Sequence, residues 1–361
     1  MKIAFDIRKI NDFGIGNYIA NLLTEISRLD LKNEYYLLGY KRDFEGLKGK
    51  FPENFNFVSA TAGKYSMSEQ LKLPLILEKI KPDVFHSPHY VIPILYKGKI
   101  ITTIHDIIHI LFPEFLPNPL AFYYAKYFIG AACKKSRLII TVSENSKKDI
   151  LRHFPEARDK ISVIYNGIDN RFFKDLQIQV REKEGLYILY TGNIKKHKNL
   201  ETLIKAYSKL EKSFPHKLMI VGGNPYRELV KIVDELNLNE KVIFKGYVSE
   251  SELISLYEQA SLFIFPSLYE GFGIPPLEAM AMGIPVLSSN FSSLPEILKD
   301  GAIYFNPLDE NELFEKAKEL LSNEMQKEKL IKKGKEIAKE YSWKNNALKT
   351  LKLYEIIGKN E

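Results

Sequence analysis

The chain contains almost no cysteine and no long apolar run. Its single cysteine, Cys133, excludes an internal disulfide and is typical of a protein kept in a reducing compartment. No apolar stretch approaches the length of a membrane span. Residues Met1–Asp6 resemble a charge-interrupted strand rather than a signal peptide. We therefore expect a cytoplasmic protein in which Cys133 is a small buried hydrophobe.

The sequence also lacks the common patterns of metal ligands. It contains no Asp-x-Asp pair and no His or Cys residues at metal-ligand spacing. We therefore predict no metal site and no cofactor.

Positive charge is in excess, and it is unevenly distributed. Residues 1–165 contain 24 Lys and Arg against 17 Asp and Glu, whereas residues 166–361 contain 28 of each. The asymmetry suggests an anionic partner for the first half: a membrane surface, nucleic acid or an acidic substrate. A lysine-rich surface that only aids solubility is an equal alternative. Since no nucleic-acid-binding motif is recognisable, we expect no nucleic acid partner.

The length and the hydrophobic pattern predict two α/β domains. At 361 residues the chain exceeds what one core usually organises. Short apolar runs alternate with amphipathic segments, as in doubly wound parallel sheets. Strands are expected first at Lys2–Ile7, Tyr35–Tyr40, Phe55–Ala60, Asp83–His86, Lys99–His105 and Leu138–Val142. A second series, beginning near Ile161, is expected at Tyr187–Tyr190, Lys217–Val221, Val242–Lys245, Leu262–Phe265, Pro285–Ser288 and Ala302–Phe305. Helices are expected at Ile15–Leu29, Asn199–Leu210, Tyr226–Asn237, Glu250–Ala260 and Pro276–Met282.

The turn-forming loop Asn166–Asp169 is the expected domain boundary. We predict Rossmann-like domains at residues 1–165 and 166–340, and a polar surface lead-in at Asp175–Glu184. A helix over 341–361, with Trp343 and Tyr354 as apolar anchors, is expected to pack back on the first domain. Two such domains would face a cleft, and ligands would bind beyond the carboxyl ends of the strands.

A strand, a glycine turn and a helix follow one another around Glu270-Gly-Phe-Gly-Ile-Pro-Pro-Leu-Glu278. Proline suits a first helical turn, and a helix N-terminus attracts phosphate. The two carboxylates can accept hydrogen bonds from paired sugar hydroxyls. For Glu278 alone, a partner of the helix dipole is the simpler reading. The whole segment favours a binding site, because its glycines cost stability unless the backbone must approach something closely.

This segment resembles the Glu-x7-Glu signature of the large retaining glycosyltransferase family with the GT-B fold, glycosyltransferase family four. Further matches, in the same order, are Gly14-Ile-Gly16, Val142-Ser143 at the end of the last strand of domain one, Val163–Asp169, Gly246–Ser249 and Gly283–Val286. The resemblance covers nearly the whole chain. It implies that Glu270 contacts hydroxyls of the donor sugar and that Glu278 holds the ribose. It also implies that the backbone of Gly271, Phe272, Gly273 and Ile274 contacts the sugar.

A second cluster, Thr191–Asn199, also follows an expected strand. Lysine near a helix start can neutralise a departing diphosphate. Lys195 and Lys196 are interpreted as a solvated run, whereas Lys198 matches the family's phosphate-binding lysine. Asn193 stands where the family usually has arginine, so a two-cation clamp is in doubt. Asparagine here resembles the bacterial surface-polysaccharide branch, rich in mannosyltransferases, which favours GDP-mannose as donor.

Histidines follow two strands of the first domain. The resemblance places His105 near the donor sugar and phosphate, and His109 outside the site. Asp106 either orients His105 or caps the next segment. His86 and His89 are equally consistent with structural roles and with acceptor contacts.

Two backbone segments complete the predicted donor site. Gly14 and Gly16 lack the third glycine of a dinucleotide fingerprint. The resemblance implies that their loop closes over the donor phosphates and the acceptor. It also implies that Val248 meets the base through backbone atoms.

These features predict a retaining, metal-independent hexosyltransferase with His105, Lys198 and Glu270 as catalytic residues. The expected donor is a nucleoside diphosphate sugar, GDP-mannose first. A glycan or lipid-linked acceptor is expected, in cell-surface polysaccharide synthesis. Alternatives are glucosyl or N-acetylglucosaminyl transfer from a UDP-sugar, a same-fold epimerase or phosphorylase, and a non-catalytic binding protein. The aromatic and cationic segment Phe122–Phe128, ahead of Lys134, Lys135 and Arg137, either binds the inner face of the cell membrane or belongs to a buried helix.

Overall fold

The computed structural model describes residues 1–64, 66–173 and 186–359. They form two compact units, one of Met1–Gly167 with Ser342–Glu361 and one of Ile168–Tyr341. The expected lead-in Asp175–Glu184 lies outside the described residues.

Unit 1 contains a parallel sheet whose described strands follow the order β3-β2-β1-β4-β5-β6-β7. The strands are β1 Lys2–Asp6, β2 Glu34–Gly39, β3 Phe55–Ser59, β4 Val84–Ser87, β5 Ile100–Thr103, β6 Leu138–Thr141 and β7 Ile161–Val163. The expectation that a second series begins near Ile161 is wrong, because β7 pairs with β6 in this first sheet. Val142-Ser143 therefore does not follow the last strand of the unit. β7 is short and only half-buried, so its apolar pattern is weak.

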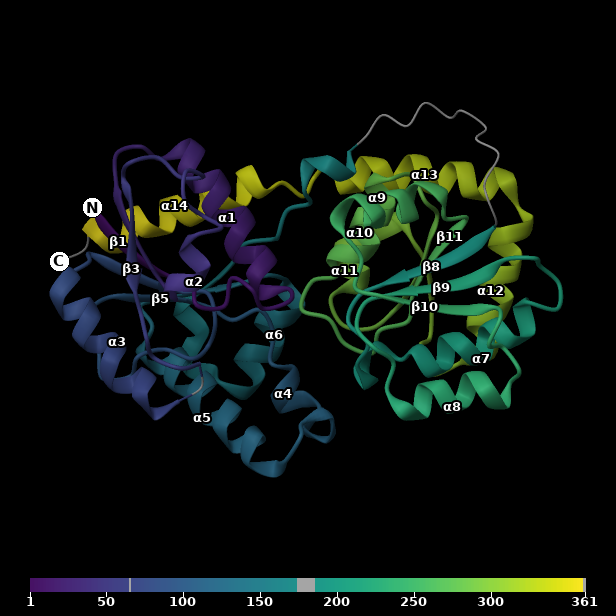
Figure 1. The fold of residues 1–361 in the computed structure, drawn as a ribbon, viewed down its shortest axis with the longest axis horizontal. Helices are drawn as coiled ribbons and strands as arrows, with labels where there is room; N and C mark the ends of the chain where they lie inside the picture. Colours follow the sequence, from purple (N-terminus) through teal and green to yellow (C-terminus); the bar gives the residue numbers. More distant parts are fainter. Residues whose placement is uncertain (65, 174–185, 360–361) are drawn as a thin grey trace. The chain divides into compact units, whose positions relative to one another are not determined.

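Helices cover both faces of this sheet (Figure 1). They are α1 Ile15–Leu29, α2 Lys41–Phe44, α3 Met67–Ile80, α4 Ile108–Leu111, α5 Pro119–Lys135, α6 Glu144–His153 and α14 Trp343–Lys359, with 3-10 turns η1 Pro113–Phe115 and η2 Pro155–Lys160. One apolar cluster joins α1 and α14 to the sheet, and another joins α3 and α5 to its other face. The helix α1 has the predicted bounds because its apolar positions recur with the helical period and face the sheet.

The C-terminal helix α14 packs within unit 1. A side chain at Gly167 would place its Cβ 2.1 Å from the backbone nitrogen of Trp343, so only glycine fits there. Asn346 donates a hydrogen bond to the Tyr165 carbonyl at 2.9 Å. The hydroxyl of Tyr354, which is fully buried, lies 2.6 Å from His86 Nδ1. These contacts fix α14 beside β4, and the Trp343 ring packs edge-on against Tyr18 of α1 at 5.9 Å.

Unit 2 contains a second parallel sheet, in the order β10-β9-β8-β11-β12-β13 for the described strands. The strands are β8 Tyr187–Thr191, β9 Lys217–Val221, β10 Val242–Gly246, β11 Leu262–Phe265, β12 Val286–Ser289 and β13 Ile303–Phe305. Its helices are α7 Leu200–Leu210, α8 Arg227–Glu235, α9 Glu250–Gln259, α10 Ile274–Ala281, α11 Leu294–Leu298, α12 Glu310–Ser322 and α13 Glu324–Ala338, with 3-10 turns η3 Asn170–Phe172, η4 Lys196–Lys198 and η5 Lys299–Gly301.

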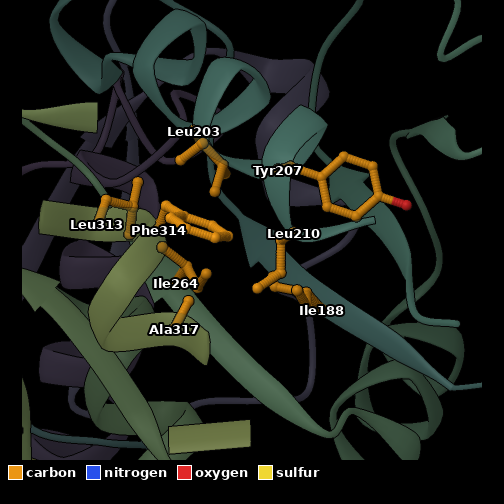
Figure 2. A pocket seen from close by; sticks show the side chains of 9 residues that line it. Ile188, Leu203, Tyr207, Leu210, Ile264, Leu313, Phe314 and Ala317 are labelled. Atoms are coloured by element: carbon orange, nitrogen blue, oxygen red, sulfur yellow. The ribbon is translucent and has the colours of Figure 1, made fainter. Parts of the chain in front are cut away.

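The helices α7 and α12 pack over the strands β8 and β11 through apolar side chains (Figure 2). Leu203 and Leu210 of α7 face Leu313 and Phe314 of α12, above Ile188. The small cavity that these side chains line is part of the core of unit 2.

Both sheets have doubly wound strand orders, as predicted. In unit 2 the six strands β8 to β13 reproduce the order 3-2-1-4-5-6 of Rossmann domains. Two boundaries differ near predicted site residues. β5 ends at Thr103, so His105 lies in the following loop, and α10 begins at Ile274, earlier than the expected Pro276.

Candidate active site

Two of the predicted catalytic residues form an ion pair at the carboxyl edge of the unit 2 sheet. Lys198 ends the 3-10 turn η4, and Glu270 lies in the loop between β11 and α10. Lys198 Nζ lies 2.5 Å from Glu270 Oε1, and the two side chains are only 11% and 13% exposed. The same ammonium lies 5.6 Å from the centre of the Phe265 ring. A cation and a carboxylate are therefore held together in a largely desolvated position.

Hydrogen bonds fix the backbone that carries Glu270. Its amide donates to Ser292 Oγ at 2.9 Å. Ser293, which is fully buried, donates from Oγ to the carbonyls of Glu270 and Phe272 at 2.9 and 3.1 Å. Ser292 adopts the left-handed conformation with φ of 53°, which is uncommon for a residue other than glycine. These two serines hold the loop in one conformation, and the sequence analysis did not identify them.

The loop of Lys198 is joined to the loop of Glu270. The Leu268 amide donates to the His197 carbonyl at 2.8 Å. Asn199, with φ of 58°, donates from Nδ2 to the carbonyls of Pro266 and Pro307 at 3.1 and 2.7 Å. The position of Lys198 relative to Glu270 is thus set by backbone contacts as well as by charge.

The glycine turn allows α10 to start next to Glu270. Gly273 has φ of 101°, and a Cβ there would lie 2.7 Å from Leu294 Cδ2. Pro275 and Pro276 occupy the first turn and have no N–H group. Of the N-terminal amides that pair with no carbonyl inside the helix, only those of Gly273 and Ile274 therefore remain. The N-terminus of α10 therefore offers fewer amide donors than a helix start without prolines would.

Glu278 lies on α10 and contacts a different set of residues. Its Oε2 accepts a hydrogen bond from Tyr257 Oη at 3.0 Å, and that hydroxyl also lies 2.6 Å from Thr191 Oγ1. Burial raises the pKa of Glu278 to about 7, although the Tyr257 hydrogen bond and Arg171 oppose the rise. Arg171 itself pairs with Asp169 at 2.5 Å. Glu278 is thus held in place by Tyr257, which sequence reasoning missed.

Asn193 and Val248 lie at the same edge of the sheet, beyond β8 and β10. The Asn193 carbonyl accepts from Tyr190 Oη at 3.0 Å, and its side-chain Oδ1 is buried with no hydrogen-bond partner among the described residues. Gly222, beyond β9, lies between these loops; a Cβ there would be 1.8 Å from the Gly192 carbonyl oxygen. This close approach requires glycine at 222, which the prediction omitted although Gly222-Gly223 directly follows an expected strand.

The predicted unit 1 residues lie around the start of α1 and the end of β5. Gly14 precedes α1 with φ of 78°, and a Cβ at Gly16 would lie 2.1 Å from the Ile10 carbonyl oxygen. His105 Nε2 lies 3.2 Å from the Pro88 carbonyl, so this nitrogen carries the proton and Nδ1 is the acceptor. Its ring meets Tyr18 edge-on at 4.8 Å. Burial lowers the pKa of His105, and Asp106 opposes that shift.

The two remaining histidines of interest have different surroundings. Both ring nitrogens of His86 are engaged in the core, by Tyr354 and by Thr103 Oγ1 at 2.8 Å, and burial lowers its pKa to about 3. His86 is therefore structural. His89 Nδ1 accepts from the Val91 amide at 3.2 Å, and its ring lies 3.9 Å from that of Tyr90.

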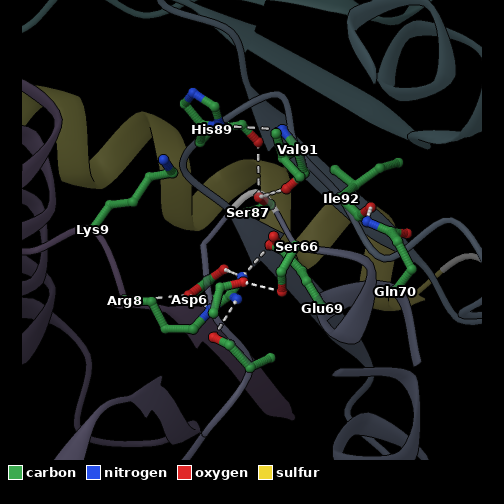
Figure 3. Close-up of polar contacts among 12 residues, drawn as sticks. Asp6, Arg8, Lys9, Ser66, Glu69, Gln70, Ser87, His89, Val91 and Ile92 are labelled. Atoms are coloured by element: carbon green, nitrogen blue, oxygen red, sulfur yellow. Dashed lines mark hydrogen bonds and ion pairs between the residues drawn. The ribbon is translucent and has the colours of Figure 1, made fainter. Parts of the chain in front are cut away.

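A charge network beyond β1 was also missed (Figure 3). The guanidinium of Arg8, almost fully buried, bonds Asp6 Oδ2 at 2.6 Å and Glu69 Oε1 at 2.5 Å. The adjacent Lys9 points toward His89. Burial lowers the pKa of Lys9 to about 8, against the effect of Asp12. The network fixes the segment that leads to Gly14. Its only sequence signal is Asp6-Ile-Arg8, since Glu69 is distant in the chain.

No helix among the described residues is both long and apolar enough to span a bilayer. No group of three or more His, Cys, Asp and Glu side chains among them could hold a metal ion.

The unit 2 site and the two doubly wound sheets define a class of protein. A lysine paired with a carboxylate beside a helix N-terminus, beyond parallel strands, fits the binding of a diphosphate that carries a sugar. Solved structures support the fold. The model matches sucrose-phosphate synthase from Thermosynechococcus elongatus with a TM-score of 0.80 at 19% identity, over 99% of both chains. It also matches WaaG, a glycosyltransferase involved in lipopolysaccharide biosynthesis, with a TM-score of 0.77 at 16% identity, over 99% and 100% of the chains. The predicted GT-B fold class is confirmed.

The family follows from sequence comparison. Residues 14–172 match the model of glycosyltransferase family 4, and residues 172–337 match that of glycosyl transferases group 1. O-antigen chain mannosyltransferase B from Escherichia coli is 30% identical, over 78% of this chain and 76% of the relative. O-antigen chain mannosyltransferase RfbU from Salmonella typhimurium is 34% identical, over 68% and 67%. The chain belongs to this glycosyltransferase family, and the prediction of a hexosyltransferase is confirmed.

Proposed function

We propose that the protein transfers a mannosyl residue from GDP-mannose, with retention at the anomeric carbon, to a glycan or lipid-linked acceptor in cell-surface polysaccharide synthesis. Two sequence relatives with named activities, quoted above, are O-antigen mannosyltransferases, which supports mannose as the sugar. Asn193, where the family usually has arginine, supports the same branch.

The observation that carries the proposal is the Lys198–Glu270 pair beside the start of α10. In this proposal the Lys198 ammonium binds the diphosphate, and the Glu270 carboxylate accepts hydrogen bonds from sugar hydroxyls. Glu278 accepts from the ribose hydroxyls, since Tyr257 holds it at the carboxyl edge of the sheet. Asn193 and the backbone of Val248 contact the nucleotide, and Gly271–Ile274 contact the sugar.

The proposed reaction breaks the bond between the anomeric carbon and the phosphate oxygen. The acceptor hydroxyl attacks on the same face, and its proton passes to the leaving phosphate. Glu270 is not assigned as a covalent nucleophile, because Oε1 faces an ammonium at 2.5 Å. Charge that develops on the leaving diphosphate is stabilised by Lys198, without a metal ion. In unit 1, His105 supports the reacting centre through the ring that Pro88 and Tyr18 orient, and the Gly14–Gly16 segment contacts the donor phosphates.

A ligand panel tests the donor. Thermal stabilisation by GDP-mannose that exceeds stabilisation by UDP-glucose and UDP-N-acetylglucosamine is the expected result. Preference for a UDP-sugar would replace the mannosyl assignment with the alternative donors.

The reaction is tested with GDP-mannose and soluble mannosyl oligosaccharides, in the presence of a chelator. We expect GDP release that requires the oligosaccharide, and an α-mannoside by NMR. A β-linked product would contradict retention, and activity that disappears with the chelator would contradict metal independence.

We further infer that unit 1 binds an anionic membrane surface through the exposed face of α5. This helix contains three lysines and no Asp or Glu. Leu120, Tyr123 and Tyr127 share one face and are 77%, 65% and 62% exposed, whereas Phe128 is buried in the core. The buried-helix alternative therefore holds for one face of α5, and the membrane proposal concerns the opposite, exposed face. Exposed aromatics interleaved with lysines suit the headgroup region of anionic bilayers.

Co-sedimentation with phosphatidylglycerol vesicles tests this surface. We expect binding that salt weakens, and that falls about fivefold for each of Lys126→Gln and Lys134→Gln. Leu120→Gln should also weaken it, whereas Leu308→Gln, a matched exposed leucine in unit 2, should not. Equal binding to phosphatidylcholine vesicles, or none at low salt, would contradict the inference.

A further inference from the structure

A diphosphate that binds Lys198 must compete with Glu270 for the same ammonium group. The ammonium that must bind a diphosphate is already neutralised by a carboxylate at 2.5 Å. Both groups are nearly buried, so neither is well compensated by water if the other is withdrawn. A diphosphate that takes over Lys198 therefore leaves Glu270 without its partner, unless the ligand itself supplies a replacement.

Glu270 cannot avoid this competition by moving its loop. Its amide and carbonyl are both hydrogen-bonded, to Ser292 and Ser293 respectively. The Lys198 side is equally restrained, because Asn199 bonds two carbonyls of neighbouring loops. Only side-chain rotation is available, so the carboxylate remains within reach of the ammonium.

The two kinds of nucleotide differ in what they offer the carboxylate. A nucleoside diphosphate sugar brings hydroxyl donors that can replace the ammonium at Glu270. A bare nucleoside diphosphate brings only further negative charge near the carboxylate. Removing one partner of a nearly buried ion pair is costly, because the remaining charge is left uncompensated.

We propose that Glu270 sets the preference for sugar-bearing over bare nucleotide, by competing with the diphosphate for Lys198. This role rests on the proposed function and adds to the contact with sugar hydroxyls. After transfer the sugar hydroxyls leave with the product, and the carboxylate returns to Lys198. The ion pair then weakens the hold on the spent diphosphate and favours its release.

Calorimetric titration of GDP and GDP-mannose tests the proposal, with UDP and UDP-glucose as a second pair of probes. In Glu270→Gln, GDP should bind about tenfold more tightly than in the wild type, a coupling in the usual range between sites. GDP-mannose should gain less, because a hydroxyl contact is weakened at the same time. Glu270→Ala provides a second variant if Glu270→Gln is poorly folded.

Two controls separate the pair from general charge effects. Glu310→Gln removes the same charge from another unit 2 ion pair, with Lys209 at 2.7 Å, and should leave GDP affinity unchanged. In a Lys198→Ala background, Glu270→Gln should no longer increase the affinity for GDP, because Glu270 and GDP have no ammonium left to compete for. Equal tightening in both backgrounds would show simple repulsion and overturn the proposal.

The remaining outcomes distinguish this inference from the function on which it rests. GDP affinity that is unchanged or weaker in both Glu270 variants would overturn the competition, while loss of binding in Lys198→Ala would still support the donor site. A wild-type protein that binds none of the four nucleotides would overturn the proposed function, and this inference with it.

Discussion

The two units carry their predicted site residues in different ways. In unit 2, Lys198, Glu270 and Glu278 are partly buried, and their partners lie at the same sheet edge. In unit 1, the polar groups of Arg8, beyond β1, and of His86, within β4, are bonded inside the unit. Arg8 forms ion pairs with Asp6 and Glu69, and both ring nitrogens of His86 form hydrogen bonds, with Tyr354 and Thr103.

Because of this difference, the kind of ligand can be inferred from the arrangement of residues in unit 2 but not in unit 1. Unit 2 presents a cation, two carboxylates and a helix start, which together fit one kind of ligand. In unit 1, buried polar contacts lie next to the loops that carry Gly14 and His105. His105 is the one predicted catalytic residue of this unit. The variants below test whether function depends on unit 2 more than on unit 1.

The largest effect is expected at Lys198. Because no other predicted residue carries positive charge to the diphosphate, Lys198→Ala should lower GDP release with mannosyl oligosaccharides by at least about 10³-fold. The variant should still fold, with a lower melting temperature because Glu270 loses its ion-pair partner. Lys209→Ala, which removes a lysine from the more exposed pair with Glu310, is the matched control. Near-normal turnover in Lys198→Ala would contradict the role.

His105 should matter less than Lys198 but more than its neighbour His109. Removing one positioned polar group typically lowers turnover about 10²-fold. The turnover of His105→Ala should therefore fall by about that factor. His109, whose Nδ1 lies 3.1 Å from Tyr90 Oη, serves as the control on the same unit. If the two alanine variants are equally active, His105 is not a catalytic residue.

Ser293 tests the backbone of the Glu270 loop. Ser293→Ala removes the hydroxyl that donates to the carbonyls of Glu270 and Phe272, so the loop should lose its single conformation. We expect turnover to fall about tenfold by analogy with other displaced catalytic groups. Donor affinity, measured by calorimetry, should change less than turnover. An unchanged turnover would show that the loop needs no such support.

The smallest effect is a pH dependence of stability at Glu278. Its pKa is raised from 4.5 to about 7, so the folded state binds the proton more tightly than the unfolded state. This carboxyl therefore lowers stability as pH rises from about 4.5 through 7, and has no effect below that window. Relative to Glu278→Gln, the wild-type melting temperature should drop by about 5 °C across it. A constant difference would contradict the raised pKa.

The elements that sequence predicted well are those with a strong local pattern. Strands Lys217–Val221 and Leu262–Phe265 have the predicted bounds because buried parallel strands are continuous apolar runs. The short, half-buried β7 has no such pattern and was assigned to the wrong domain. The strand before His105 was extended too far because its apolar run continues beyond the last pairing at Thr103.

Among the site residues, too, those within a strong local sequence pattern were predicted and the others were not. Glu270, Gly273 and Glu278 were found because they lie within one contiguous motif. Tyr257 and Ser293, which hold those residues, lie elsewhere in the chain and have ordinary sequence surroundings. Single-sequence reasoning finds the groups that contact a ligand more readily than the groups that position them.

The central claim is that unit 2 holds the donor through Lys198. Calorimetric titration of GDP-mannose into the wild type and Lys198→Ala, with Lys209→Ala alongside, tests it most directly. The account predicts saturable binding to the wild type and to Lys209→Ala, and a loss of about 100-fold or more in affinity for Lys198→Ala. Equal affinity in all three proteins would contradict it.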